Sequence, residues 1–330
     1  MNVALIGCGG VGMKRALALP PNARLAVVCD VMAERARAVS AALGGAATVE
    51  EDWRKTVSLP GIDAVVVATT NNLLAPIAMA AVQAGKHVLA EKPGACRAEQ
   101  LRPLLAEIEA RGVIVRVGFN HRYHPAILKA KALCEANALG PLTHVRARYG
   151  HGGRPGYDRE WRGDPAIAGG GELLDQGSHL IDLSRWFLGS SFTSIHGCLT
   201  TAFWDMPVED NAFLLLRTSS GQIAQLHASW SEWKNLFSFE IFGRHGKLEI
   251  NGLGGSYGVE RLTHYQMSRQ MGPPDSTSWE WPGPDLSWHR ELADFIDDAR
   301  RGHHRASSDV ANAISVLELI ESVYAKSPLA

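Results

Sequence analysis

This chain of 330 residues has no excess of either charge. Its 33 Lys and Arg residues almost balance 34 Asp and Glu residues, which leaves a formal net charge of −1. A protein that holds a phosphate backbone or an anionic bilayer by electrostatic attraction needs a basic surplus. We therefore expect no nucleic-acid partner and no membrane partner.

Cysteine is scarce, and the spacing of the cysteines indicates neither a disulfide framework nor a metal site. The five cysteines are an odd number, and no two of them are spaced as C-x-x-C. This pattern argues against a disulfide scaffold and against a zinc site. We expect no metal, and a cytoplasmic location fits the cysteine usage best.

Long apolar runs are missing as well. The longest apolar stretch, residues 64–82, is interrupted by polar residues at 69–72 and by Pro76, so it is not a membrane span. The chain opens on a strand-like run without a cationic region before it, which argues against a signal peptide. A hydrophobic content of 46% is typical of globular proteins, and the length predicts two domains.

The first 120 residues alternate short apolar runs with helix-length segments. The apolar runs are continuous in Val, Ile, Leu and Ala, as in strands buried on both faces. They cover residues 3–6, 25–29, 64–68, 87–90 and 113–119, and the helical segments cover 11–19, 32–43, 73–84 and 97–111. This alternation predicts an α/β fold with a doubly wound parallel sheet over residues 1–120.

The pattern changes after residue 120. Residues 172–188 read as a strong helix, and residues 237–250 alternate around a turn at 243–246, as in a hairpin of a half-exposed sheet. A second hairpin turn is expected at 219–221. Two helices with apolar stripes end the chain, one with Trp288, Leu292, Phe295 and Ile296, the other with Val310, Ile314, Leu317 and Ile320. We expect a second domain over residues 121–330.

A glycine-rich turn follows the first strand. Gly7, Gly9 and Gly12 form a G-x-G-x-x-G pattern that also contains Gly10 and Val11 and opens the first helix. Gly7 permits a tight turn, Gly9 lets a pyrophosphate approach the backbone, and Gly12 lets helix and strand pack closely. The helix N-terminus then stabilises the phosphate charge.

Asp30 ends the second strand, 18 residues after the last of these glycines. A carboxylate at this position accepts hydrogen bonds from the adenine ribose and repels a 2′-phosphate. The sequence therefore favours NAD over NADP. The alternative is that Asp30 only caps the next helix.

Two further segments carry residues suited to catalysis. Glu91 and Lys92 follow the strand 87–90, at the edge of the sheet where ligands bind, and the Lys92 ammonium suits oxygen charge that develops during hydride transfer. On an ideal helix over 172–188, Asp175, His179 and Asp182 share a stripe opposite the apolar face. His179 titrates near neutral pH and is suited to accept a hydroxyl proton, while Asp175 orients the ring or binds a hydroxyl. Alternatively, Lys92 is an ordinary surface lysine. Asp175 and His179 equally fit a pair on an exposed helix that has no catalytic role.

Together these residues resemble the Gfo/Idh/MocA family of oxidoreductases. The resemblance covers nearly the whole chain in order: the glycine turn, Glu91-Lys92-Pro93, the segment 118–123, and Gly169-Gly170-Gly171 leading into Asp175, His179 and Asp182. It implies an N-terminal Rossmann domain and a C-terminal α/β domain with an open, largely antiparallel sheet. It also implies hydride transfer between a nicotinamide cofactor and a hydroxyl or ketone of a sugar, sugar derivative or cyclitol.

The resemblance also assigns roles to residues. Lys92, Asp175 and His179 match the family's catalytic positions, and Thr69, Asn71 and Glu91 match segments that bind the cofactor. The family often has Thr-Pro-Asn where this chain has Thr69-Thr70-Asn71, and two arginines where it has His121 and Arg122. The resemblance places substrate contacts at Lys92, Asp175 and His179, and further at Asn120, His121, Tyr157, Trp161 and Arg162. The loop 150–162 binds a phosphate, a carboxylate or a sugar face, or else forms a subunit contact. A homodimer or homotetramer through the C-terminal sheet is implied.

Two rival functions are also compatible with these residues. One is an enzyme that keeps NAD bound and uses transient oxidation for epimerisation or glycoside cleavage. The other is a redox-inactive regulator that senses NAD, and the presence of Lys92, Asp175 and His179 argues against it because sensing needs only the cofactor turn.

Overall fold

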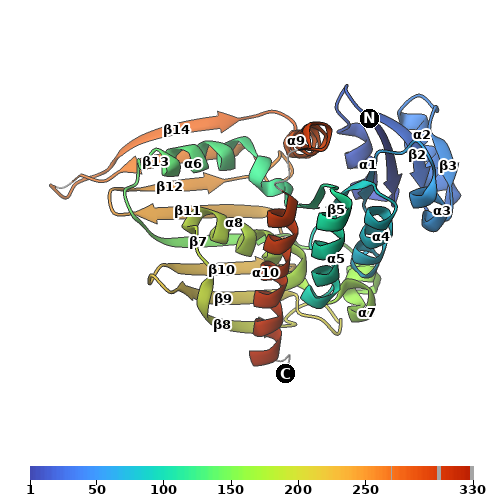
Figure 1. Ribbon diagram of the computed structural model, residues 1–330. Helices are drawn as coiled ribbons and strands as arrows, with labels where there is room; N and C mark the ends of the chain where they lie inside the picture. Colours follow the sequence, from blue (N-terminus) through green and yellow to red (C-terminus); the bar gives the residue numbers. More distant parts are fainter. Residues whose placement is uncertain (269, 303–305, 328–330) are drawn as a thin grey trace. The chain divides into compact units, whose positions relative to one another are not determined.

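The computed structural model describes residues 1–268, 270–302 and 306–327 of the chain. These residues divide into two compact units. The first unit comprises residues 1–119, 166–169 and 288–317, and the second comprises residues 120–165, 170–287 and 318–330. Each unit is built around its own sheet (Figure 1).

The first unit contains a six-stranded parallel sheet in the order β3-β2-β1-β4-β5-β6. Its strands are β1 (Asn2–Ile6), β2 (Arg24–Cys29), β3 (Thr48–Glu50), β4 (Ala64–Val67), β5 (His87–Glu91) and β6 (Val115–Gly118). Its helices are α1 (Gly10–Leu17), α2 (Ala33–Ala42), α3 (Trp53–Ser58), α4 (Asn71–Gln83) and α5 (Ala98–Arg111). The order reverses beside β1, which confirms the predicted doubly wound sheet.

The predicted apolar runs became strands because helices cover them. Every residue of β4 is buried, as a central parallel strand requires. The sequence reading missed β3 and α3, which are short and of mixed polarity. β3 is an edge strand with no fully buried residue, so it has no continuous apolar run to reveal it.

The second unit contains an eight-stranded sheet in the order β14-β13-β12-β11-β7-β10-β9-β8. The strands are β7 (Leu142–Gly150), β8 (Phe192–Thr200), β9 (Asn211–Thr218), β10 (Ile223–Ser229), β11 (Leu236–Gly243), β12 (Gly246–Asn251), β13 (Glu260–Gln266) and β14 (Asp275–Trp281). Only β7 and β10 pair in parallel, so the expected open and largely antiparallel sheet is confirmed. Both predicted hairpins are present, β9–β10 and β11–β12.

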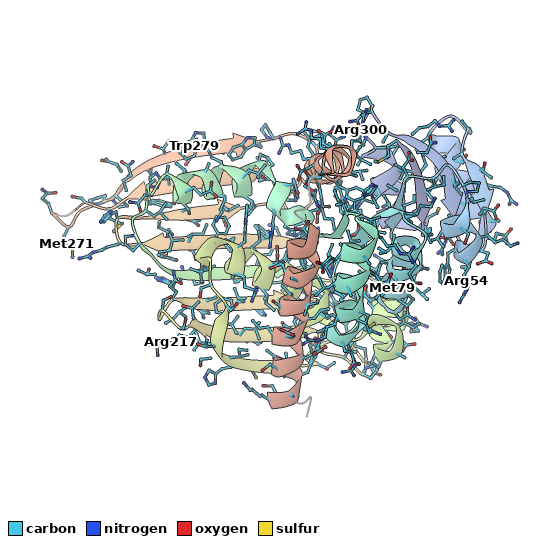
Figure 2. The ribbon with its side chains drawn as sticks, viewed as in Figure 1. Arg54, Met79, Arg217, Met271, Trp279 and Arg300 are labelled. Atoms are coloured by element: carbon cyan, nitrogen blue, oxygen red, sulfur yellow. The ribbon has the colours of Figure 1, made fainter. Side chains whose placement is uncertain are left out.

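Helices cover one face of this sheet. α6 (Pro125–Glu135) packs on β12, β13 and β14, and α8 (Ser178–Leu188) packs on β7 and β10 (Figure 1). Trp279 lies on β14 (Figure 2). The Lys129 ammonium on α6 lies 5.1 Å from the centroid of its ring. Along β9 the buried residues Leu214 and Leu216 alternate with the exposed Phe213, so the opposite face of the sheet is open to solvent along this strand.

The shorter elements of the chain lie around this framework. They are the 3-10 turns Asn120–Tyr123, Tyr157–Arg159 and Trp161–Gly163, and the short helix α7 (Pro165–Ala168). The helices α9 (Ser287–Arg301) and α10 (Ala306–Lys326) end the chain. In the part of the chain that the structure describes, no helix combines the length and apolarity needed to cross a bilayer.

The expected helix over 172–188 is present but is not a regular α-helix. It starts as a π-helical turn over Leu173–Gly177 and continues as α8. The ideal-helix geometry is wrong at this point because a π-turn advances each residue by a smaller angle. The stripe is also not exposed, since His179 is 4% exposed and Asp182 is fully buried.

The two compact units are not separated by a single boundary at residue 120, and the packing of α9 explains why. Leu292, Phe295 and Ile296 of its apolar stripe are fully buried in the core that contains Val3 and Leu5 of β1. The segment 288–317 therefore belongs to the first unit, although it follows the second unit's sheet in the sequence. The first boundary of the units lies between residues 119 and 120.

Candidate active site

The glycine turn lies between β1 and α1, as the sequence predicted. Gly7 adopts a φ of +94°, and a Cβ there would lie 2.3 Å from the Ala68 carbonyl oxygen. A Cβ on Gly12 would lie 2.0 Å from the Gly7 carbonyl oxygen. These two glycines are therefore required by the packing of the first unit itself.

Gly9 and Gly10 differ from these packed glycines. A Cβ added at either position meets no atom within 4 Å in the chain. The turn is therefore open in front of the α1 N-terminus, where backbone N–H groups and the helix dipole favour an anion. This open cradle fits the pyrophosphate of a dinucleotide.

Asp30 is tied to the glycine turn. Its carboxylate accepts the Cys8 backbone N–H at 2.7 Å and the Met32 backbone N–H at 2.9 Å. Asp30 is half-buried, whereas Val31 after it is 80% exposed. The carboxylate is thus fixed at the end of β2 and places negative charge beside the turn, the arrangement expected for a ribose-binding residue.

Glu91 takes part in a buried ion-pair cluster. Arg15 on α1 lies 2.5 Å from Glu91 through Nε and 2.7 Å from Glu291 of α9 through Nη1, and its side chain is fully buried. A Cβ on Gly118 would lie 2.7 Å from the Arg15 guanidinium, so a larger residue there would displace this side chain. Glu91 therefore anchors the residue before Lys92 to the helix of the glycine turn.

Thr69 and Asn71 follow β4. Thr69 is half-buried and its hydroxyl donates to the Thr70 carbonyl. The Asn71 amide donates to the Ala168 carbonyl at 2.8 Å, and Cys96 Sγ lies 3.5 Å from the Ile167 carbonyl oxygen. Asn71 and Cys96 thus hold the segment 166–169 within the first unit.

The second unit places His179 against His121. The two rings are stacked with centroids 3.6 Å apart and an interplanar angle of 19°. Tyr149 of β7 meets both rings, with centroids 5.1 Å from His121 and 6.2 Å from His179. Burial raises the pKa of Tyr149 well above its ordinary value, so this phenol keeps its proton.

Asp175 is paired with a residue of the 150–162 loop region. Arg162 Nε donates to an Asp175 carboxylate oxygen at 3.0 Å, and the Arg162 guanidinium lies 4.5 Å from the Trp161 ring centroid. Because a guanidinium stabilises the charged carboxylate, Asp175 is held as an anion and hydrogen-bond acceptor. The structure thus brings together Asp175, Arg162 and Trp161, which the sequence analysis singled out separately.

Asn120, Arg122 and Asp182 form protein contacts beside the stacked histidines. Asn120 is 4% exposed, and its amide donates to Ser287 Oγ at 2.9 Å. Arg122 donates to Asp182 through Nε at 2.8 Å, so the last carboxylate of the predicted stripe neutralises a neighbouring cation. Asp182 therefore fixes α8 against the segment that carries His121.

Tyr157 is part of an aromatic cluster. It is 3% exposed and contacts Trp204 and Trp230, with ring centroids 5.7 Å and 5.2 Å away. Met206 and Val208 complete this small core. Trp161, by contrast, is half-buried, and the Arg162 guanidinium lies over its ring.

Three polar or aromatic residues near these groups were missed in the sequence. Arg15 and Glu291 are fully buried charges on helices, and Tyr149 is a buried phenol on β7. Their partners lie tens or hundreds of residues away, so local spacing carries no sign of them. One signal in the sequence indicates such a buried charge, namely a charged residue directly beside the apolar stripe of a helix. Glu291, next to Leu292, is an example.

The predicted residues divide between the two units. The first unit holds Gly7, Gly9, Gly10, Val11, Gly12, Asp30, Thr69, Asn71, Glu91 and Lys92, and the second holds Asn120, His121, Tyr157, Trp161, Arg162, Asp175 and His179. Lys92 directly follows β5 and is half-buried. Among the residues that the structure describes, no group of three or more potential ligands has the geometry of a metal site.

Comparisons with known proteins find relatives of both parts of the chain. Residues 1–119 match the family described as an oxidoreductase family with an NAD-binding Rossmann fold, and residues 127–249 match the GFO/IDH/MocA C-terminal domain. Levoglucosan dehydrogenase of Pseudarthrobacter phenanthrenivorans is 29% identical over 288 residues, 76% of this chain and 73% of that protein. A dTDP-3,4-didehydro-2,6-dideoxy-alpha-D-glucose 3-reductase of Streptomyces violaceoruber is 31% identical over 339 aligned positions, 98% of this chain and 94% of that protein.

A solved structure of levoglucosan dehydrogenase in complex with NADH superposes with a TM-score of 0.86 at 26% identity. The match covers 99% of this chain and 98% of that one. Both domains and almost the full length are thus shared with dehydrogenases and reductases of sugars. The chain belongs to the Gfo/Idh/MocA family of oxidoreductases.

Proposed function

We propose that this oxidoreductase transfers a hydride between NAD and a hydroxyl carbon of a neutral sugar or cyclitol. The observation that carries the proposal is the buried His179, four residues after a carboxylate, Asp175, that Arg162 holds in its charged form. An imidazole and a fixed acceptor one helical turn apart suit the handling of a hydroxyl proton.

Each residue has a defined role in this proposal. Gly9, Gly10 and the α1 N-terminus bind the pyrophosphate, and Asp30 binds the ribose and makes NAD the preferred cofactor. When bound, NAD supplies the hydride acceptor for alcohol oxidation. His179 accepts the hydroxyl proton, and the Lys92 ammonium stabilises the negative oxygen charge that develops during hydride transfer.

The loop cations support a substrate without a phosphate or carboxylate. Arg162 is neutralised by Asp175, and Arg154 lies 2.7 Å from Glu160 through an ion pair. An anion bound at either arginine would lie beside one of these carboxylates, and the repulsion between the two negative charges would oppose its binding. The ring faces of Trp161 and the hydrogen-bond acceptors of Asp175 remain suited to hydroxylated, uncharged rings.

The test follows the absorbance of reduced nicotinamide while the enzyme is given NAD and a substrate panel. The panel contains neutral sugars and cyclitols, the corresponding uronates and sugar phosphates, and a dTDP-sugar. We expect turnover with neutral members, and loss of roughly 10²- to 10⁴-fold in the His179→Asn variant with NAD affinity retained. Turnover only with charged members contradicts the neutral class. A complete lack of turnover favours the NAD-sensing alternative.

Transient oxidation is a separate outcome of the same experiment. An enzyme that epimerises or cleaves its substrate while keeping NAD bound gives product without net accumulation of NADH. Analysis of the sugars by chromatography after the reaction distinguishes this outcome from simple dehydrogenation.

We also propose that the chain assembles as a homodimer or homotetramer through the second unit's sheet. On the sheet face opposite the buried Leu214 and Leu216, Phe213, Leu215 and Ile223 are 46%, 53% and 41% exposed. Arg146 and Glu240 form an ion pair on neighbouring strands of the same sheet. Light scattering should show a dimer or tetramer that dissociates in Leu215→Glu, whereas a monomeric wild-type chain contradicts this assembly.

A further inference from the structure

Glu209 contacts the start of the helical segment that carries Asp175 and His179. It lies just before β9 and is 1% exposed. Its Oε1 accepts the Leu173 N–H at 3.0 Å and the Gly171 N–H at 3.2 Å, and its backbone carbonyl accepts the N–H of the residue between them at 2.9 Å. The first N–H groups of a helix have no acceptor within the helix. One residue of another segment therefore binds three successive N–H groups at this N-terminus.

Tyr324 of α10 adds a third donor to the Glu209 carboxyl group. Its hydroxyl donates to the same Oε1 at 2.8 Å. Burial raises the pKa of Tyr324 well above its ordinary value, so the hydroxyl keeps its proton. Burial also raises the pKa of Glu209, and the hydrogen bonds that it accepts oppose the rise. Because all three donors meet Oε1, a proton on this carboxyl group would lie on Oε2, and Oε1 remains an acceptor in both charge states.

Two glycines allow this close approach. A Cβ on Gly171 would lie 2.1 Å from the Glu209 carbonyl oxygen, and a Cβ on Gly170 would lie 2.1 Å from the Tyr324 hydroxyl oxygen. Any larger residue at either position would separate the turn from its two partners. Packing against Glu209 and Tyr324 thus explains why glycines lead into the segment that carries Asp175.

Both partners are held by the sheet of the second unit. The Asp210 carbonyl, next to Glu209, accepts the Trp230 N–H at the end of β10 at 2.7 Å. Ser327, after the end of α10, donates through Oγ to the Gly197 carbonyl of β8 at 2.6 Å. The acceptor and the third donor therefore lie on a rigid support, as a precisely positioned site requires.

The residues bound by Glu209 lead directly to Asp175. The Gly171 carbonyl accepts the Asp175 N–H at 3.0 Å, so two hydrogen bonds connect Glu209 to the Asp175 backbone. Asp175 lies in the π-helical turn, and His179 follows in α8. Because π-helical turns are rare, contacts from outside the turn are needed to stabilise this one.

The same turn carries a second carboxyl group, that of Glu172. Its side chain is fully buried, and its backbone N–H is the one bound by the Glu209 carbonyl. Burial raises the pKa of Tyr149, and the charges of Asp175 and Glu172 raise it further. The contacts of Glu209 thus hold both carboxyl groups near this phenol.

We propose that Glu209, supported by Tyr324, is a positioning residue that fixes the π-turn and so sets the place of Asp175 relative to His179. The proposal rests on Asp175 and His179 carrying the proposed function. Glu209 acts through its acceptor oxygen and touches neither substrate nor cofactor in this role. A loose turn would misplace the proton-handling pair without removing either residue.

The test measures hydrogen–deuterium exchange of residues 171–177 in the full-length chain, independently of turnover. Glu209→Met keeps the length of the side chain but removes both oxygens. Glu209→Gln keeps an oxygen for the same donors, and Tyr324→Phe removes one donor only. Leu262→Ala, which leaves a cavity at a fully buried position of β13, is the control for a general loss of stability.

We expect Glu209→Met to speed the exchange of residues 171–177 by roughly tenfold or more, because their N–H groups lose their acceptor. Glu209→Gln should stay within about threefold of wild type, and Tyr324→Phe should exchange more slowly than Glu209→Met because both N–H bonds remain. Unchanged exchange in Glu209→Met overturns the proposal, and so does equal acceleration in Glu209→Gln. Equal acceleration in Leu262→Ala overturns it as well, because the effect then reflects global unfolding.

The kcat of sugar oxidation, expressed per folded chain, provides the second readout. Glu209→Met should lower kcat by roughly 10- to 100-fold with NAD affinity retained, because a small misplacement of reacting groups slows the chemical step. Leu262→Ala should keep the wild-type kcat.

The two readouts separate the proposal from the function on which it rests. If the wild type oxidises no sugar, the proposed function fails, while the exchange rates still decide whether Glu209 fixes the turn. If oxidation occurs and kcat is unchanged in Glu209→Met, the proposed function stands and the positioning role of Glu209 is refuted.

Discussion

We predict that Glu291 makes the stability of the first unit depend on pH. Two carboxylates, Glu91 and Glu291, share the single guanidinium of Arg15, and all three side chains are buried. Burial raises the pKa of Glu291 to about 7, with a further rise from the nearby Glu91 charge and an opposing effect of Arg15. The folded state therefore binds a proton that the unfolded state releases near pH 4.5.

The sign and size of the effect follow from linkage. Between pH 4.5 and about 7 the folded chain holds more protons than the unfolded chain, so its stability falls as the pH rises through this window. Each pKa unit corresponds to about 1.36 kcal/mol. Glu291 should therefore cost about 3 kcal/mol at pH 8 relative to pH 4.5.

The Glu291→Gln variant removes this titration and keeps an oxygen that can accept from Arg15. We expect it to match wild type near pH 4.5 and to exceed it by up to about 3 kcal/mol at pH 8. Urea unfolding of both proteins at several pH values measures the difference. Burial lowers the pKa of His144, His227 and His264, which gives both proteins the opposite slope and cancels in the comparison.

A variant at an exposed carboxylate serves as control. Glu34→Gln on α2 makes the same replacement at a carboxylate that is exposed to solvent, and its stability is measured over the same pH range. A difference between wild type and Glu291→Gln that is the same at pH 5 and pH 8 would falsify the reasoning. Lower stability of Glu291→Gln at pH 8 would also refute it, since the charged form would then be favourable.

Three further predictions concern the first unit. Gly12→Ala should destabilise the chain by about 1–3 kcal/mol because its Cβ meets backbone 2.0 Å away, whereas Gly9→Ala should leave urea unfolding within about 0.5 kcal/mol and weaken NAD binding by calorimetry. Equal losses of stability in the two variants would contradict this distinction. Asp30→Asn should reduce the preference for NAD over NADP in parallel titrations, and tighter NADP binding by the wild type would show that Asp30 does not select the cofactor. Lys92→Ala should retain NAD binding but lower kcat by roughly 10²-fold or more on any accepted sugar, and wild-type turnover would remove Lys92 from the mechanism.

Much of the first unit could be predicted from the sequence because its signals are local. A buried parallel strand needs a continuous apolar run, and the tight turn after β1 needs glycine at positions 7 and 12 for steric reasons. Because these requirements act over a few neighbouring residues, they can be predicted from the sequence. The same applies to the hairpins of the second unit, where alternation and turn residues define β9–β10 and β11–β12.

The partners of the charged and titrating side chains could not be predicted from the sequence in this way. The spacing of Asp175 and His179 indicated that they form a pair. Only the tertiary structure shows that Arg162 forms an ion pair with the Asp175 carboxylate and that the His121 ring stacks on the His179 imidazole. The π-turn before α8 also changes the phase of the helix, which an ideal repeat of 100° per residue cannot anticipate.

The sequence by itself determined the fold class, the cofactor turn and the residue types available for catalysis, because steric limits and apolar periodicity act between near neighbours. Only the tertiary structure decided that α9 joins the first unit's core, that Arg15 serves two carboxylates, and that His121 covers His179. Burial and electrostatic interaction depend on distance in space. They become defined only when segments far apart in the chain pack together.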